Sequence, residues 1–172
     1  MKYVPYLSIG GLAALLLLSM SACGGGAAAE PTPPAIHYGE DACELCGMII
    51  SEEPHAAAYV TRDGHGHVFD DIGDMVRAHL AEPAEVAAFF VHDYADKSWI
   101  RAETASYLLS QELHTPMGSG LAAFASAEKA QALADELGGE VLTFEQVLAH
   151  YRKMAFAIIM TEPIERQSPR HA

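Results

Sequence analysis

The chain has 172 residues, with 10 lysines and arginines against 23 aspartates and glutamates, and its formal net charge is −13 at pH 7. A surface this acidic argues against nucleic acid as a partner and against peripheral binding to anionic lipid head groups. It is compatible with the attraction of cations, but most carboxylates of an acidic protein are simply solvated. Charge alone therefore does not identify the function.

Residues 1–22 have the features of a secretory signal: a basic residue, Lys2, an apolar run at 9–18, and small residues before Cys23. The apolar run is shorter than the roughly 20 residues of a membrane-spanning helix. Met20-Ser21-Ala22-Cys23 resembles the lipobox of bacterial lipoproteins, although the first position is usually Leu. We expect lipidation of Cys23 and an anchor in the cell membrane or outer membrane, facing the periplasm. The alternative is ordinary secretory cleavage near Ala22.

The next segment, 23–37, is predicted to be a flexible tether, because its Gly, Ala and Pro residues bury too little apolar surface to become ordered. The folded domain is expected at 38–160, and a polar tail at 161–172. About 120 residues suit a single domain. Lys2 is the one charged residue of the signal, so the mature chain has 9 basic and 23 acidic residues, a net charge of −14.

The first half of the domain, about 43–92, is predicted to contain short strands around one helix. Asp63-Gly64 is a strong hairpin signal between two of the strands. Asp70 or Asp71 is the expected helix cap. The apolar face of this helix follows a helical period and consists of Ile72, Met75, Val76, His79 and Leu80. The expected strands are 48–51, 57–61, 67–70 and 86–91.

The second half, about 93–145, loosely repeats this plan. Ser126 caps a helix that ends at Gly138-Gly139 and buries Ala130, Leu133, Ala134 and Leu137. The expected strands are 99–102, 106–109, 121–125 and 141–144. A shift of 55 residues aligns Phe69 with Phe124, Val86 with Val141 and Phe89 with Phe144. We therefore predict an α+β fold of two repeated β-β-α-β halves, packed as one compact unit.

A C-terminal helix is predicted after these halves, because Thr143 and Gln146 form a capping-box pair. Packing onto the domain is the expected use of its apolar face, and binding of a partner is the alternative. That face consists of Val147, Leu148, Tyr151, Met154, Ala155 and Ile158.

The segment Cys43-Glu44-Leu45-Cys46-Gly47-Met48 carries the most chemical information, and four interpretations compete. Structural zinc needs four ligands, but the chain has no second CxxC pair and no His-x₃₋₅-His. A thioredoxin-like redox pair belongs at the start of a helix, whereas Gly-Met-Ile-Ile after Cys46 is strand-like. A Cys43–Cys46 disulfide is chemically easy in an oxidising compartment, and it is compatible with a metal-binding role.

The fourth interpretation is a Cu(I) site. In an extended segment residues i and i+2 lie on the same face, so Cys46 and Met48 converge, with Gly47 between them. A thiolate and a thioether are soft donors, which select Cu(I) over Mg²⁺ or Ca²⁺. The alternative is that Met48 is a core residue that fills space.

Together these features resemble the nitrous oxide reductase accessory lipoproteins, the NosL family. The lipobox and Cys46-Gly47-Met48 are followed by further matching stretches in the family's order. No single motif is diagnostic, but the ordered set is specific and runs from about Cys43 to Phe144. Members of the family have two β-β-α-β halves, in agreement with the repeat. The other matching stretches are Phe69-Asp70-Asp71-Ile72 with Met75, His92-Asp93-Tyr94, Trp99-Ile100 and Pro116-Met117-Gly118-Ser119-Gly120.

The resemblance implies a Cu(I) chaperone that supplies copper for the copper-sulfide centre of nitrous oxide reductase. Its expected partners are the apo-reductase and a membrane ABC-transporter complex of the same assembly pathway. Cys46 and Met48 match the family's copper motif, and Met117 is the best candidate for a further soft ligand. Cys43 is a weaker candidate, as ligand or disulfide partner, and His92 is a weak imidazole candidate.

Other histidines and carboxylates receive lesser roles. His65 and His67 lie in the hairpin and are candidates for metal capture, whereas His79 is expected in the core. Asp70 and Asp71 are assigned to helix capping before any site role. The sequence has no lipase-type Gly-x-Ser-x-Gly and no phosphate-binding glycine loop, so we predict no enzyme activity. The competing hypotheses are a thiol oxidoreductase that uses Cys43 and Cys46, and a lipoprotein that sequesters copper without a dedicated target.

Overall fold

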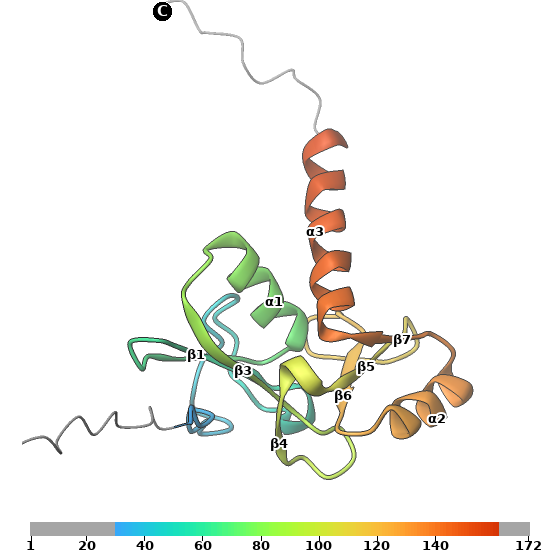
Figure 1. Ribbon diagram of the computed structural model, residues 1–172, viewed down its shortest axis with the longest axis horizontal. Coiled ribbons are helices and arrows are strands. Elements are labelled where there is room, and N and C mark those ends of the chain that lie inside the picture. Colours follow the sequence, from blue (N-terminus) through green and yellow to red (C-terminus); the bar gives the residue numbers. More distant parts are fainter. Residues whose placement is uncertain (1–29, 162–172) are drawn as a thin grey trace, which may run out of the picture. The chain divides into compact units, whose positions relative to one another are not determined.

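The computed structural model describes residues 30–161 (Figure 1). The predicted signal 1–22, residues 23–29 of the tether with the lipidation residue Cys23, and nearly all of the polar tail lie outside these residues. Residues 31–161 belong to one compact unit. Ile36 packs against the hydrophobic core, so the last part of the predicted tether contacts the domain.

The first half forms a four-stranded antiparallel sheet in the order β2-β1-β3-β4. Helix α1 connects β2 to β3 and contacts β1 and β2. A 3-10 turn, η1 (Glu53–His55), precedes the sheet. The elements are β1 (Ala57–Thr61), β2 (Gly66–Phe69), α1 (Ile72–Ala81), β3 (Val86–His92) and β4 (Trp99–Arg101).

The second half forms a three-stranded antiparallel sheet in the order β6-β5-β7. Helix α2 connects β6 to β7, as α1 connects β2 to β3 (Figure 1). The predicted α+β fold of two β-β-α-β halves is therefore confirmed. The elements are a 3-10 turn η2 (Ala102–Thr104), β5 (Ser106–Leu109), β6 (Leu121–Phe124), α2 (Ala127–Leu137), β7 (Glu140–Thr143) and α3 (Phe144–Thr161).

Both helix caps lie where the sequence places them. The Asp71 carboxylate accepts a hydrogen bond from Gly73 N–H at 2.6 Å, and the Ser126 hydroxyl accepts one from Lys129 N–H at 3.4 Å. Such a bond satisfies one of the free N–H groups in the first turn of a helix. Because the two caps are 55 residues apart, the repeat offset is correct for β2-α1 and β6-α2.

The offset is wrong for the last strand of each half. Tyr59 lies opposite Phe89, and the corresponding residue of β5, Leu108, lies opposite Val141. Phe89 is therefore equivalent to Val141, at an offset of 52, and Phe144 instead begins α3. The connection from helix to strand is shorter in the second half, and a fixed offset does not allow for it.

Two further strand predictions need correction. Residues 48–51 form no strand. Ile49 pairs with Ala42 in an isolated β-bridge instead. The strand predicted at 99–102 exists as β4, but it pairs with β3 in the first sheet. A short strand has no period that identifies its neighbour, since long-range hydrogen bonds decide which sheet it joins.

One hydrophobic core connects the two halves. Phe144 lies 5.2 Å from Phe89 and 6.0 Å from Tyr107 between ring centroids, so it contacts aromatic rings of both sheets. Burial of a side chain of this size stabilises the fold by about 1.5–3 kcal/mol. The core also contains Phe69, Ile72, Met75, Val91, Leu121, Leu142 and Val147.

Helix α3 begins with the predicted capping box. Gln146 Oε1 accepts from Thr143 N–H at 2.8 Å, and Thr143 Oγ1 accepts from Gln146 N–H at 3.3 Å. The first turns of the predicted face are packed, with Val147 and Tyr151 buried, whereas Met154 is 48% exposed. Among residues 30–161, no helix is long and apolar enough to cross a membrane.

Candidate metal site

The site starts from a tight turn at 43–48. Cys43 N–H donates to the Met48 carbonyl at 2.8 Å, and Gly47 N–H donates to the Cys43 carbonyl at 2.9 Å. Gly47 has φ +75°, in the left-handed region that favours glycine. The expectation of an extended segment is therefore wrong. The turn, not a strand's alternation, places Cys43 and Cys46 on one side of the chain.

Glu44 attaches this turn to β2. Its backbone N–H donates to the Val68 carbonyl at 3.1 Å, and its carboxylate accepts from Val68 N–H at 3.3 Å. The same carboxylate lies 2.6 Å from Nδ1 of His67. These bonds hold the thiols beside the end of β2, and they give His67 a structural partner.

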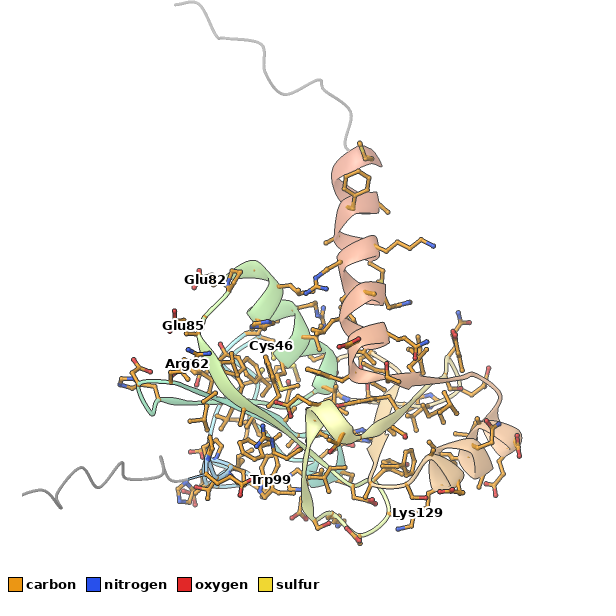
Figure 2. The ribbon with its side chains drawn as sticks, viewed as in Figure 1. Cys46, Arg62, Glu82, Glu85, Trp99 and Lys129 are labelled. Atoms are coloured by element: carbon orange, nitrogen blue, oxygen red, sulfur yellow. The ribbon has the colours of Figure 1, made fainter. Side chains whose placement is uncertain are left out.

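The chain immediately after β2 supplies two carboxylates that face the thiols. Cys43 Sγ lies 3.5 Å from Asp74 Oδ2, and Cys46 Sγ lies 3.7 Å from both carboxylate oxygens of Asp70. One donor atom from each of the four residues lies within 4.8 Å of the other three. Figure 2 shows Cys46 beside α1, where this cluster forms.

Three of the four residues of the cluster are almost fully buried. Cys43, Asp70 and Asp74 are 2%, 2% and 1% exposed, and Cys46 is partly exposed. Cys46 therefore offers the route by which an ion or a partner's ligand reaches the site. Both cysteines are free thiols, so the disulfide considered above is not formed in this conformation.

Burial controls the protonation of the thiols. It raises the pKa of Cys43 to about 12, opposed by backbone N–H groups that point at the sulfur. Burial also raises the pKa of Cys46, and the charge of Asp70 adds to this. The pKa of Asp74 is raised by burial, against the attraction of Arg77, which bonds to it at 2.5 Å. Both thiols therefore carry protons at neutral pH until a metal ion displaces them.

The loop that carries Met117 is attached to the start of the same helix. The carboxylate of Asp71 accepts from Thr115 Oγ1 at 2.7 Å and from Met117 N–H at 3.2 Å. Gly73 permits the close contact, because an added Cβ would lie 2.7 Å from the Ser119 Cβ. The first turn of α1 thus contacts the thiol turn of the first half and the methionine loop of the second.

The two candidate methionines differ in exposure. Met48 is 52% exposed, so it is no core residue. Met117 is partly buried and lines a pocket of about 280 Å³ together with Arg77, Tyr151 and Met154. Both side chains are accessible to an incoming ion, and neither is required to fill the core.

His92 lies in a different environment from the cysteines. Its Nδ1 is 2.6 Å from the Lys97 carbonyl, its Nε2 is 2.8 Å from the Tyr38 hydroxyl, and its ring lies 3.8 Å from that of Trp99. Both ring nitrogens are occupied, so His92 has a structural role in this conformation. Among the described residues, the metal-type cluster of cysteine and carboxylate groups contains no histidine.

The remaining histidines follow the predictions in part. His65 is exposed and its ring bonds to Asp63. It is therefore accessible to an ion, but it lies well after the 43–48 turn in the sequence, and among the described residues no hydrogen bond joins it to that turn. His79 packs against Phe89 at 4.9 Å, as expected for a core histidine, and burial lowers its pKa.

Asp70 and Asp74 are the site residues that the sequence interpretation misses. It assigns Asp70 to capping, but Asp71 alone caps α1, which leaves the Asp70 carboxylate for the thiols. The spacing of Asp70 and Asp74 indicates that they share a face, because residues four apart at the start of a helix lie on one side of it. The spacing does not show what that face contacts, because the sequence does not give the position of the cysteines.

Fold and site together define a small α+β domain in which a buried thiol, a partly exposed thiol and two buried carboxylates form a set of donors that could hold a metal ion. Comparison with known proteins agrees with this class. The NosL family model matches residues 34–151, which is more than half of the chain. The chain belongs to the NosL family.

Two relatives illustrate the similarity. The chain is 30% identical over 147 residues to the "Copper-binding lipoprotein NosL" of Stutzerimonas stutzeri, a match that covers 79% of this chain and 77% of the relative. The crystal structure of the copper chaperone NosL from Shewanella denitrificans has a similar fold, with a TM-score of 0.60. Its sequence identity is 24%, and the match covers 67% of this chain and 94% of that one.

Proposed function

We propose that this protein is a periplasm-facing lipoprotein, anchored through Cys23, that binds Cu(I) and delivers it for assembly of the copper-sulfide centre of nitrous oxide reductase. The observation that carries the proposal is the pair of free thiols that face Asp70 and Asp74, with Cys46 partly exposed and the exposed Met48 two residues further along the turn. The curated relative, named as a copper-binding lipoprotein, supports copper as the ion.

The donor chemistry supports the Cu(I) state. Thiolate and thioether ligands select Cu(I), which accepts low coordination numbers. Cys46 and Met48 belong to one turn, and Met117 comes from a loop bonded to Asp71 at the same helix end. We assign Cys46, Met48 and Met117 as the ligands. Cu(I) displaces the proton of Cys46 when it binds.

Ligand exchange is the proposed means of delivery. A partner's soft donor approaches from the side of Cys46 and Met48, because these are the exposed residues of the site. Copper then passes through a shared intermediate without release into solution. The proposed partners are the apo-reductase and the membrane ABC-transporter complex of the pathway.

The geometry argues against the thiol oxidoreductase. A redox CxxC pair depends on a thiol whose pKa is lowered at a helix N-terminus. Here burial raises the pKa of both thiols, and Cys43 is 2% exposed. Neither cysteine lies in the first turn of a helix, so neither is poised to attack a disulfide.

A Cu(I) titration against a competing chelator tests the proposal on the full chain, reduced and in detergent. We expect Cys46→Ser to lower the Cu(I) affinity by more than about 100-fold, since loss of outer-shell partners alone costs 10–100-fold. Wild type and Cys46→Ser binding equally weakly would contradict the assignment.

Delivery is tested by mixing the Cu(I)-loaded protein with apo-reductase and following copper on each after separation. Transfer faster than copper release to the chelator supports a dedicated chaperone. Transfer no faster than that release would leave a lipoprotein that only sequesters copper.

A further inference from the structure

The second half of α3 extends away from the domain. Tyr151 is buried, whereas each residue of 152–157 is exposed, and Figure 1 shows this part of the helix beyond α1 and both sheets. The match to the NosL family also ends at residue 151. Packing onto the domain therefore does not explain the apolar side chains of 152–160. The large ones are Met154, Phe156 and Met160, which are 48%, 59% and 69% exposed.

The apolar residues of this helix end surround the helix instead of forming one stripe. The sequence from Met154 to Met160 is an unbroken apolar run of seven residues, and successive residues of an α-helix are about 100° apart around its axis. A protein groove or a second helix covers one side of a helix, so it would leave part of this run in water. A helix that is apolar all round is instead typical of a large protein core or of a membrane.

The run is too short to cross a bilayer. Seven residues rise about 10 Å along a helix, whereas the hydrocarbon core is about 30 Å thick. Apolar helical segments that bind at the bilayer interface enter it by about 5–10 Å, and the length of the run suits this depth. The polar residues that follow Met160 then stay on the side of the membrane on which the domain lies.

The charge of this end of the chain is opposite to that of the rest. Residues 146–172 contain four basic and two acidic residues, a net charge of +2, whereas residues 23–145 contain five basic and 21 acidic residues, a net charge of −16. Arg152 and Lys153 are neighbours at the base of the apolar run, and within residues 30–161 neither forms an ion pair with a carboxylate. A basic pair beside apolar residues is complementary to anionic lipid head groups. The argument from net charge against such lipids therefore applies to the domain and not to this helix end.

We propose that residues 152–160 dock on an anionic phospholipid surface, that of the membrane in which the lipid anchor lies. Pro34 lies against Gly66 of β2, and the chain from Cys23 to Pro34 extends to at most about 36–40 Å. This reach exceeds the length of α3, whose 18 residues rise about 27 Å, so the anchor and the helix end can reach the same membrane. Docking fixes the orientation of the domain, which an anchor on a tether does not. The shared membrane rests on the proposed function, whereas the affinity of the helix end for anionic lipid does not.

The test uses tryptophan fluorescence of the lipidated protein in vesicles whose brominated acyl chains quench any tryptophan among them. Wild type has one tryptophan, Trp99 of β4, which gives the background and which Figure 2 shows away from the end of α3. Phe156→Trp adds a probe to the apolar run. In vesicles of phosphatidylglycerol and phosphatidylcholine we expect the added tryptophan to be blue-shifted and quenched about twofold or more, since it lies at the depth of the upper acyl chains. Trp99 should be unquenched.

The contribution of charge is tested in the same Phe156→Trp protein. Lys153→Gln should shift the equilibrium between docked and free helix about fivefold toward the free state, the effect of one basic residue near an anionic surface. Lys129→Gln removes the same charge from an exposed position of α2 and is the matched control, which should dock as the parent does. Equal quenching in anionic vesicles and in phosphatidylcholine alone would overturn the proposed anionic surface.

The remaining outcomes separate the possible occupants of this surface. If the protein floats with the vesicles and the added tryptophan is not quenched, the docking proposal is wrong although the anchor is present. A blue shift without quenching that grows with protein concentration would show a second copy on this helix end, and it would equally overturn the proposal.

Two further results distinguish this inference from the proposed function. Quenching in a protein that binds no Cu(I), or in a chain without lipid at Cys23, would support the docking of α3 and reject the corresponding part of the proposed function. Phe156→Ser should abolish the contact with lipid, seen as loss of the anionic-lipid effect on protection of α3 from proteolysis, and should keep the Cu(I) affinity of wild type. Unchanged protection in Phe156→Ser would contradict docking through the apolar run.

Discussion

The starts of α1 and α2 are 55 residues apart, and each helix begins after a capping side chain, Asp71 or Ser126. The flanking positions differ in chemistry. Asp70 corresponds to Ala125, whose N–H is bonded by Asp93 at 2.8 Å, and Asp74 corresponds to the exposed Lys129. The repeat has therefore kept the residue that starts the helix in both halves, while only the first half carries carboxylates that face a metal site.

The β1-β2 and β5-β6 hairpins also differ, and here the second half has the additional feature. Residues 62–65 connect β1 to β2, whereas the longer segment 110–120 connects β5 to β6. The added length allows Thr115 and Met117 to bond to Asp71. One half thus provides the thiols and carboxylates, and the other provides a loop long enough to bond to Asp71 at the start of α1. Four predictions test this division.

The largest effect is expected at the equivalent aromatic residues Phe69 and Phe124, which are 1% and 3% exposed. Each change to Ala should lower the free energy of unfolding by about 3–5 kcal/mol, measured by urea denaturation. Only Phe69→Ala should also weaken Cu(I) binding, since Phe69 follows Val68, the residue to which Glu44 attaches the turn that carries Cys46. An equal loss of Cu(I) affinity in Phe124→Ala would contradict this difference between the two halves.

The next largest difference is expected between the two helix caps, Asp71 and Ser126. Ser126→Ala should cost about 1 kcal/mol, the usual value for a lost N-cap. Asp71→Ala should cost about 3 kcal/mol, because it also leaves the Thr115 hydroxyl and the Met117 N–H without their acceptor. Urea denaturation of both variants measures the difference. Equal costs would mean that the 110–120 loop does not depend on Asp71.

A smaller effect is expected from Met117→Leu, which keeps the size of the side chain and removes its sulfur. The Cu(I) affinity should fall about tenfold, or about 1.4 kcal/mol, with the thermal midpoint unchanged. Met160→Leu makes the same change at an exposed position of α3 and should leave the affinity unchanged. A chelator competition that gives identical affinities for both variants removes Met117 from the ligand set.

The smallest effect is expected at Gly47 and Gly118, whose φ angles are +75° and +66°. A Cβ added at either glycine would meet no atom within 4 Å, so replacement by Ala carries only the conformational cost of about 1 kcal/mol. Thermal unfolding should give similar values for both variants. A much larger cost at one of them would indicate an additional contact of that loop.

Features that depend on neighbours in the sequence were predictable. The caps Asp71 and Ser126, the capping box of Thr143 and Gln146, and the order of strands and helices agree with the structure. Each follows from hydrogen bonds or side-chain periods within a few residues. The wrong strand at 48–51 is the exception, because a turn closed at Gly47 competes with the extended chain that the apolar residues favour.

The sequence by itself thus determined the repeated order of strands and helix in the two halves and the caps at which the helices begin, and it singled out Cys46 as a candidate ligand. Only the tertiary structure decided that Asp70 and Asp74 face the thiols, that β4 joins the first sheet, and that the Met117 loop bonds to α1. The contacts of the two carboxylates and of the Met117 loop join residues that are 24 to 46 positions apart. Such contacts depend on the packing of both halves around one core, and no local pattern encodes that packing.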